Sequence, residues 1–181
     1  HLKDMPTLEV LILWGTVVGD DGLAQLKKLP RLEILILRST SITDAGLDHL
    51  KDIAKLHTLD IGATKVGDAG LDHLKALKNI EILDVNGTKI TDKSLGVVKG
   101  MGKLHTLNLG GTAITDAGLA QLKGLTGLEQ LYLTDTIITD VSLLVLQGLP
   151  RLQVLQLTNT KVTDKGVQAL KKKLPEVEIV R

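Results

Sequence analysis

The residues best suited to chemistry recur in this chain at intervals of 24. Seven aspartates form one such column: Asp20, Asp44, Asp68, Asp92, Asp116, Asp140 and Asp164. A row of carboxylates could bind cations, but one per interval supplies too few oxygens for calcium, which takes about six to eight ligands. We therefore expect the aspartates to cap helices, because an acceptor at a helix start satisfies free N–H groups and opposes the helix dipole.

A second column contains histidines between glutamates, and it reads Glu9, Glu33, His57, Glu81, His105, Glu129 and Gln153. Histidine and glutamate are ordinary zinc ligands, so His57, Glu81 and His105 could hold a zinc ion. Two parallel-strand spacings would separate the histidines by about 9.6 Å, which favours a plain ladder of alternating charges. The chain has no glycine-rich phosphate loop, and every Ser, His or Asp candidate belongs to a repeated column. We expect no catalytic residue, metal or cofactor.

The elements that position these columns follow from the same period. An apolar residue stands at the first position of every 24-residue interval: Leu8, Leu32, Leu56, Ile80, Leu104, Leu128 and Leu152. A fixed period between about 20 and 50 residues is typical of a solenoid. Residues 56–61 alternate like a strand, and residues 68–77 carry a helical apolar stripe. The pattern predicts a right-handed, curved α/β solenoid with an eight-stranded parallel sheet on its concave face and short helices on its convex face.

Two further columns have structural roles in this prediction. An unbroken threonine column follows the strands, where hydroxyl groups could bond buried backbone groups of adjacent turns: Thr16, Thr40, Thr64, Thr88, Thr112, Thr136 and Thr160. Small residues recur in the first helical turn, which indicates close packing against the neighbouring coil: Gly22, Gly46, Gly70, Ser94, Gly118, Ser142 and Gly166.

The composition limits the possible functions. The 22 basic and 21 acidic residues nearly balance, which argues against a general nucleic-acid binder. The absence of cysteine excludes disulfides and thiolate metal sites but leaves the compartment open. No apolar run reaches the length of about 18 residues that a membrane helix needs, so we expect no membrane insertion.

The repeated phrase L-x-x-L-x-L-x-x-T-x-[IV]-[TG]-D-x-[GS]-[LV] resembles the leucine-rich-repeat family along the whole chain. It is similar to a 24-residue bacterial type, and its I-T-D-x-G-L segment is close to the cysteine-containing subfamily of F-box substrate receptors. Threonine stands here where most families place asparagine or cysteine. The resemblance implies a protein-binding horseshoe or arc, and it implies no chemistry.

We expect a single repeat domain over residues 1–181. Residues 1–7 match the tail of a helix from a truncated repeat, residues 8–175 hold seven repeats, and residues 176–181 form a terminal half-repeat. Because the chain starts inside a repeat, we expect it to be a fragment whose upstream part could hold a targeting signal, a cap or another domain.

The concave strand face is the predicted recognition surface, because sequence variation concentrates there. The expected partner-binding residues lie in two strand-face columns: Trp14, Ile36, Arg38, Asp60, Asp84, Asn86, Asn108, Tyr132 and Gln156. Aromatic and arginine side chains are typical binding anchors, and Tyr132 is the expected anchor here. We expect a protein ligand, whose surface could be basic opposite Asp60 and Asp84.

Two alternatives remain open at this stage. The chain could instead be a structural spacer or scaffold that positions an upstream domain. The apolar cluster at the start of the chain could be covered by a cap, by an upstream segment or by a second copy, or it could contact the ligand: Val10, Ile12, Trp14, Val17 and Ile36.

Overall fold

The computed structural model describes residues 5–181, in which eight short strands form one parallel sheet in chain order. The strands are β1 (Val10–Ile12), β2 (Ile34–Ile36), β3 (Thr58–Asp60), β4 (Ile82–Asp84), β5 (Thr106–Asn108), β6 (Gln130–Tyr132), β7 (Val154–Gln156) and β8 (Glu178–Val180). Each strand pairs with the next at the 24-residue offset, so that Ile36 lies beside Asp60, and Asp84 lies beside Asn108. The predicted eight-stranded solenoid is confirmed. Residues 1–4 of the expected 1–7 tail lie outside the described residues.

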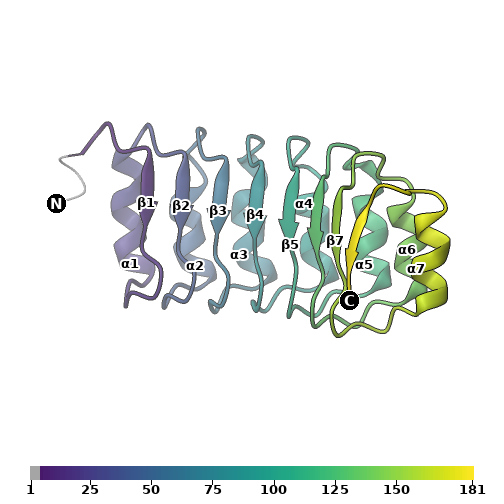
Figure 1. Cartoon of the computed structure of the whole chain (residues 1–181). Coiled ribbons are helices and arrows are strands. Elements are labelled where there is room, and N and C mark those ends of the chain that lie inside the picture. Colours follow the sequence, from purple (N-terminus) through teal and green to yellow (C-terminus); the bar gives the residue numbers. More distant parts are fainter. Residues whose placement is uncertain (1–4) are drawn as a thin grey trace.

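Short helices cover one side of the sheet and leave the other side open (Figure 1). The α-helices are α1 (Asp20–Leu23), α2 (Asp44–Leu47), α3 (Asp68–Asp72), α4 (Leu95–Val98), α5 (Asp116–Leu119), α6 (Asp140–Leu146) and α7 (Asp164–Lys171). The 3-10 segments are η2 (Ala24–Lys28), η3 (Asp48–Leu50), η4 (His73–Ala76), η5 (Asp92–Ser94) and η6 (Ala120–Gly124). The helix expected over 68–77 is therefore an α-helical turn that tightens into a 3-10 turn, as is common at the end of a short helix.

Aliphatic side chains fill the space between the sheet and the helices. The central residue of each interior strand is fully buried, and the same position recurs as Leu35, Leu59, Leu83, Leu107, Leu131 and Leu155. Because leucine, isoleucine and valine are slim, successive coils stack at the spacing of neighbouring strands, about 4.8 Å. No helix of residues 5–181 has the length and apolar character required to cross a membrane.

The threonine column closes a turn within its own coil. Thr40 Oγ1 donates to the carbonyl of Leu37 at 2.7 Å, and Thr88 Oγ1 donates to the carbonyl of Val85 at 2.6 Å. The expected bonds to adjacent coils were therefore wrong. The reason is the backbone, which enters the left-handed region one residue earlier, at Gly15, Ser39, Ala63, Gly87, Gly111, Asp135 and Asn159. This conformation folds the hydroxyl back onto its own strand end.

The aspartate column joins each coil to the next one. Both oxygens of Asp92 accept hydrogen bonds from Thr115 in the following coil: the backbone N–H at 2.8 Å and the hydroxyl at 2.6 Å. The residue that caps the helix is the preceding threonine, since Thr115 Oγ1 accepts from the Ala117 N–H at 3.2 Å. The prediction that the aspartates are caps was wrong in this respect. They stand at the first helical position, and their partners lie 23 residues ahead.

The column of small residues packs against the neighbouring coil, as predicted, and from Gly46 onward it contacts the aspartate of that coil. A Cβ atom on Gly70 would lie 2.6 Å from Asp44 Oδ1, which is closer than such atoms approach. Where serine replaces glycine, its hydroxyl donates to the carboxylate instead: Ser94 to Asp68, and Ser142 to Asp116. The column thus needs either no side chain or a hydrogen-bond donor.

Candidate functional site

The open side of the sheet presents two partly exposed residues from each interior strand, and the second of them belongs to the predicted binding columns. These second residues alternate with the buried leucines and stand in register along the stack: Ile36, Asp60, Asp84, Asn108, Tyr132 and Gln156. A further partly exposed column lies two residues further along each coil and contains Arg38 and Asn86. The structure therefore places the predicted binding residues on one continuous face.

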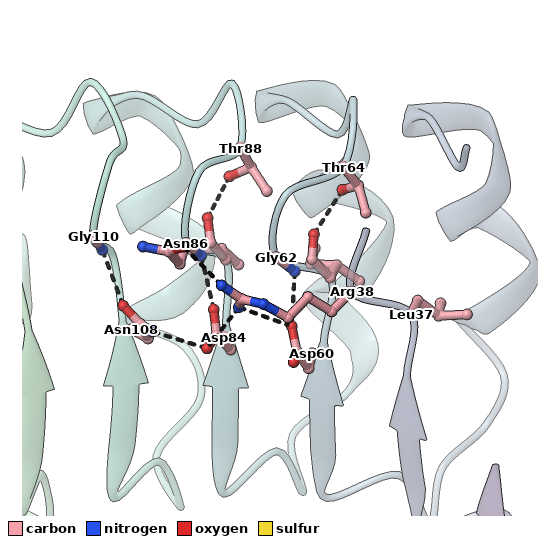
Figure 2. A network of polar contacts seen from close by, with 12 residues as sticks. Leu37, Arg38, Asp60, Gly62, Thr64, Asp84, Asn86, Thr88, Asn108 and Gly110 are labelled. Carbon is pink, nitrogen blue, oxygen red and sulfur yellow. Dashed lines mark hydrogen bonds and ion pairs between the residues drawn. The ribbon is translucent and has the colours of Figure 1, made fainter. Parts of the chain in front are cut away.

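A polar network crosses the middle of this face (Figure 2). Arg38 lies at its centre: its Nη1 is 3.4 Å from Asp84 Oδ2 and 3.8 Å from Asp60 Oδ1, and its Nη2 donates to Asn86 Oδ1 at 3.0 Å. Asn108 Nδ2 donates to Asp84 Oδ2 at 2.8 Å. We call these five residues, Arg38, Asp60, Asp84, Asn86 and Asn108, the concave network. It connects four successive coils.

Short backbone bonds fix the orientation of its acceptors. Asp60 Oδ1 accepts from the Gly62 N–H at 2.8 Å, and Asp84 Oδ1 accepts from the Asn86 N–H at 2.8 Å. Asn108 Oδ1 accepts from the Gly110 N–H at 3.1 Å. Each side chain therefore accepts a hydrogen bond from the residue two positions ahead in its own coil, which limits its rotation.

Two glycines make room for the network. A Cβ atom on Gly62 would collide with Arg38 Nη1, and one on Gly110 would lie 2.6 Å from Asn86 Nδ2. A long side chain in one coil therefore extends over a glycine in the next coil. Sequence reasoning missed both glycines, although the signal was present in the alternation of Arg38, Gly62, Asn86 and Gly110 along one column.

The network carries an excess of negative charge, because two carboxylates share one guanidinium. Burial raises the pKa of Asp60 above its ordinary value, and the neighbouring Asp84 charge adds to this effect. The Gly62 N–H and Arg38 act in the opposite direction without cancelling it. The negative charge of ionised Asp60 is thus only partly balanced by its neighbours in the folded chain. An additional cationic group nearby would stabilise the ionised form.

Not all predicted site residues join this network. Arg38 was an expected partner-binding residue, and its guanidinium contacts the carboxylates of Asp60 and Asp84 and the amide of Asn86. Tyr132 lies one strand beyond Asn108, and its hydroxyl donates to Gln130 Oε1 at 3.0 Å on the same strand. Gln156 lies on the next strand again. Sequence reasoning did not identify Gln130 as the partner of Tyr132.

At the β1 end of the stack, apolar side chains are exposed beside the same face. Ile12 and Trp14 are 64% and 67% exposed, and Val10 and Val17 are exposed as well. Ile36 on β2 pairs in register with Ile12 and is half-buried. The open strand face therefore changes along the stack, from apolar at β1 and β2, through the concave network, to tyrosine and amides at β6 and β7.

The histidines pair with the glutamate of the preceding coil. His57 Nε2 lies 3.6 Å from Glu33 Oε2, and His105 Nε2 lies 3.8 Å from Glu81 Oε2. The Nδ1 atoms lie near the hydroxyls of the next residues in the chain, Thr58 and Thr106. Within residues 5–181, no three histidine, aspartate or glutamate side chains gather into a group that could hold a metal ion.

Comparison with known proteins identifies the repeat. The leucine rich repeat family model matches residues 102–162. No curated protein matches the sequence. The cysteine-containing, F-box-like subfamily is not confirmed, since the match is to the general repeat and the chain has no cysteine.

Three solved structures of similar shape come from bacteria. An internalin (inlF) of Listeria monocytogenes aligns with a TM-score of 0.72 and 20% identity, over 99% of this chain and 55% of the internalin. An internalin C2 of the same species gives a TM-score of 0.68 and 23% identity, over 98% of this chain and 82% of its own. A Leptospira interrogans protein gives 0.72 and 18%, over 99% of this chain and 50% of its own.

The chain thus spans about half the length of the first and third of these proteins. At identities of 23% or less, the likeness establishes the fold, a leucine-rich-repeat solenoid. Together with the family match, it supports a leucine-rich-repeat protein.

Proposed function

We propose that the open strand face is a recognition surface for another protein and that the chain does no catalysis. The concave network is the observation that carries this proposal. A chain that needed only to stack coils would require its buried leucines, its threonines and its aspartates. The network adds a polar pattern over four coils that none of these structural columns uses.

The network is suited to recognition because its side chains are already held. Binding usually costs about 0.5–1.5 kcal/mol for each flexible side chain that becomes immobilised. Here backbone N–H groups fix the carboxylates of Asp60 and Asp84, and these two carboxylates in turn hold the guanidinium of Arg38. A partner would therefore meet a prearranged surface and would lose less entropy on docking.

The charge of the network favours a partner with a lysine or arginine opposite Asp60. The excess negative charge of the two aspartates supports this choice, since Arg38 can neutralise only one of them. Tyr132 would supply apolar contact area beside the network, and Gln156 and Asn108 would supply hydrogen bonds, a mixture typical of antibody binding loops. Ile12, Trp14 and Ile36 would receive an apolar part of the partner at the other end.

The proposal is tested by capturing partners from the source organism with three immobilised proteins. These are the wild type, a concave-face variant carrying Tyr132→Ala and Asp84→Lys, and a helix-face variant carrying Lys75→Ala and Lys99→Ala. We expect one specific protein to be retained by the wild type and the helix-face variant and to be lost from the concave-face variant. Because Asp84→Lys could disturb folding, Tyr132→Ala alone serves as a second variant, with thermal unfolding as its check.

The opposite pattern would refute the proposal. A partner that both concave-face variants retain, and that the helix-face variant loses, would show that the helices form the recognition surface. Capture of no specific protein by the wild type would instead favour a spacer or scaffold.

A further inference from the structure

The two long edges of the stack differ in charge. One edge holds the residues that lead into the strands: residues 5–9 before β1, the return loops, and the last two residues of each coil's helical segment (the upper edge in Figure 1). We call it the return-loop edge. Its acidic residues are six: Glu9, Glu33, Asp52, Glu81, Glu129 and Glu176. Its basic residues are fourteen: Lys27, Lys28, Arg31, Lys51, Lys55, Lys75, Lys78, Lys99, Lys103, Lys123, Arg151, Lys171, Lys172 and Lys173.

The opposite edge, where the strands end and the helices begin, has no basic excess. Its basic residues are Arg38, Lys65, Lys89, Lys93, Lys161, Lys165 and Arg181. Its acidic residues are Asp20, Asp21, Asp44, Asp68, Asp92, Asp116, Asp135, Asp140 and Asp164. The formal net charge of +1 for the whole chain therefore conceals a separation of charge between the two edges.

The fold does not require all of this positive charge. Cations at helix C-termini interact favourably with the helix dipole, which accounts for lysines in a last helical turn, such as Lys27 and Lys123. Six of the fourteen basic residues lie in loops beyond the helices, where no dipole explains them: Arg31, Lys55, Lys78, Lys103, Arg151 and Lys173.

The positive charge of the return-loop edge is largely unpaired. All fourteen basic residues are exposed. Within residues 5–181, Lys51 alone among them forms an ion pair, with Asp48 at 2.9 Å. Two of the edge carboxylates, Glu33 and Glu81, lie beside histidines instead. The edge therefore offers an excess of cations to a partner.

The cations are distributed along the whole edge. Each of the seven passages from helix to strand carries at least one of them. Six spacings between neighbouring parallel strands give this row a length of about 30 Å. A slim anionic chain laid across the coils would therefore meet a cation at every coil, whereas a short acidic run of a protein would meet only some of them.

The residue types of the edge favour a polysaccharide over a nucleic acid. Single-stranded nucleic acids bind by stacking their bases on aromatic side chains. The two aromatic residues of this chain, Trp14 and Tyr132, belong to the strand-face columns instead. Twelve of the fourteen cations are lysines, which are hydrated point charges without the planar fork by which arginine recognises phosphates and bases.

We propose that the return-loop edge binds a linear acidic polysaccharide, of the sulfated type, laid along the stack. Sulfate and carboxylate groups recur on the units of such a chain and would face the lysines of successive coils. The edge is separate from the concave network, so the inference does not depend on the proposed function of the strand face.

The experiment measures the binding of fluorescently labelled heparin, a sulfated polysaccharide, to three proteins by fluorescence anisotropy. These are the wild type, an edge variant and a variant of the opposite edge. The edge variant carries Lys55→Gln, Lys78→Gln and Lys103→Gln. The opposite-edge variant carries Lys65→Gln, Lys89→Gln and Lys161→Gln. All six lysines are exposed, and both variants lose the same charge, so they differ only in where the charge is lost.

We expect the edge variant to bind heparin about tenfold more weakly than the wild type and to show a shallower salt dependence, because fewer counterions are released. The opposite-edge variant should lose less than about twofold, and thermal unfolding of both variants should match the wild type. On the wild type, a DNA duplex and polyglutamate should each bind at least about tenfold more weakly than heparin.

Several results would overturn the proposal. Equal weakening of heparin binding in the two variants would show that net charge, not the return-loop edge, is responsible. Binding of the DNA duplex or of polyglutamate as tight as that of heparin would indicate a nucleic acid or an acidic protein. Absence of heparin binding to the wild type at about 0.15 M salt would show that the edge binds no such polymer.

Discussion

Asp116 shows how a single side chain can belong to two coils. It stands at the first position of α5, yet its hydrogen bonds come from Thr139 and Ser142 in the next coil. Partial burial by itself raises the pKa of Asp116, but the hydrogen bonds donated by Ser142 and Thr139 outweigh it and hold the pKa below its ordinary value. Asp68 has the same arrangement with Ser94 and Thr91, and its pKa is lowered in the same way.

At the residue scale, removing the serine hydroxyl should weaken the junction in a pH-dependent manner. A carboxylate with a lowered folded-state pKa stabilises the fold above its unfolded value, here 3.8, and this contribution is lost as the pH falls through the folded value. Ser142→Ala should cost about 1 kcal/mol in the free energy of unfolding at pH 7, because the carboxylate loses one donor. Urea unfolding at several pH values measures the effect.

The pH dependence separates this cause from a packing defect. The difference between the wild type and Ser142→Ala should shrink as the pH falls below about 3.8, because Asp116 is protonated first in the unfolded chain and, through its lowered pKa, at still lower pH in the folded chain. Ser41→Ala serves as a control, because Ser41 is exposed and should change the free energy of unfolding by less than about 0.5 kcal/mol. A loss in Ser142→Ala that stays constant down to pH 2 would contradict the hydrogen-bond explanation.

At the scale of elements, the helix starts differ from coil to coil. Threonine precedes α2, α5, α6 and α7 and caps each of them with its hydroxyl. Gly67 precedes α3, and no side chain caps that helix. Its backbone is nevertheless extended like that of the threonines, with φ −129° and ψ −160°. The third coil therefore lacks a cap that its geometry would permit.

Gly67→Thr should therefore stabilise the chain. A Cβ at this position would meet its nearest atoms, in Lys89, at an ordinary 3.6 Å, so the side chain fits. The new hydroxyl would accept from a free N–H of α3 and could donate to Asp44, as Thr115 does to Asp92. We expect a gain of about 1 kcal/mol in the free energy of unfolding, measured in urea.

A second glycine provides the matched control. Gly87 has φ +64°, a conformation that threonine rarely adopts, so Gly87→Thr should destabilise the chain by about 1–2 kcal/mol. If both substitutions lower the free energy of unfolding, the cap is not what distinguishes the third coil.

At the scale of the whole molecule, the 24-residue repeat makes the fold predictable from the sequence. Because each coil contacts its neighbours, the leucine and small-residue columns predict the buried face, the sheet register and the packing of coils. The partners of Asp92 and Thr88 were not predictable in this way. A carboxylate that caps its own helix and one that bonds the next coil occupy the same sequence position, and only the backbone geometry distinguishes them.

The candidate site, like the fold, was predictable from the sequence only in part. Strand alternation predicts which residues face the open side, so Asp60, Asp84 and Asn108 were found from the sequence. It does not predict where a long side chain ends, so the contacts of Arg38 were not predicted. Its guanidinium extends over Gly62 to the carboxylate of Asp84, two coils away. Contacts across two coils depend on rotamers, which a 24-residue period does not encode.

The central claim is that a partner protein sits on the open strand face, and photo-cross-linking tests it most directly. A benzophenone amino acid is placed at Gln156, on the strand face beside Tyr132, or at Lys75, in η4 on the helix side. Each protein is mixed with the partner captured by the wild type and is then irradiated. We predict a cross-link to that partner from position 156 and none from position 75. A cross-link from position 75 without one from position 156 would place the partner on the helices and contradict the account.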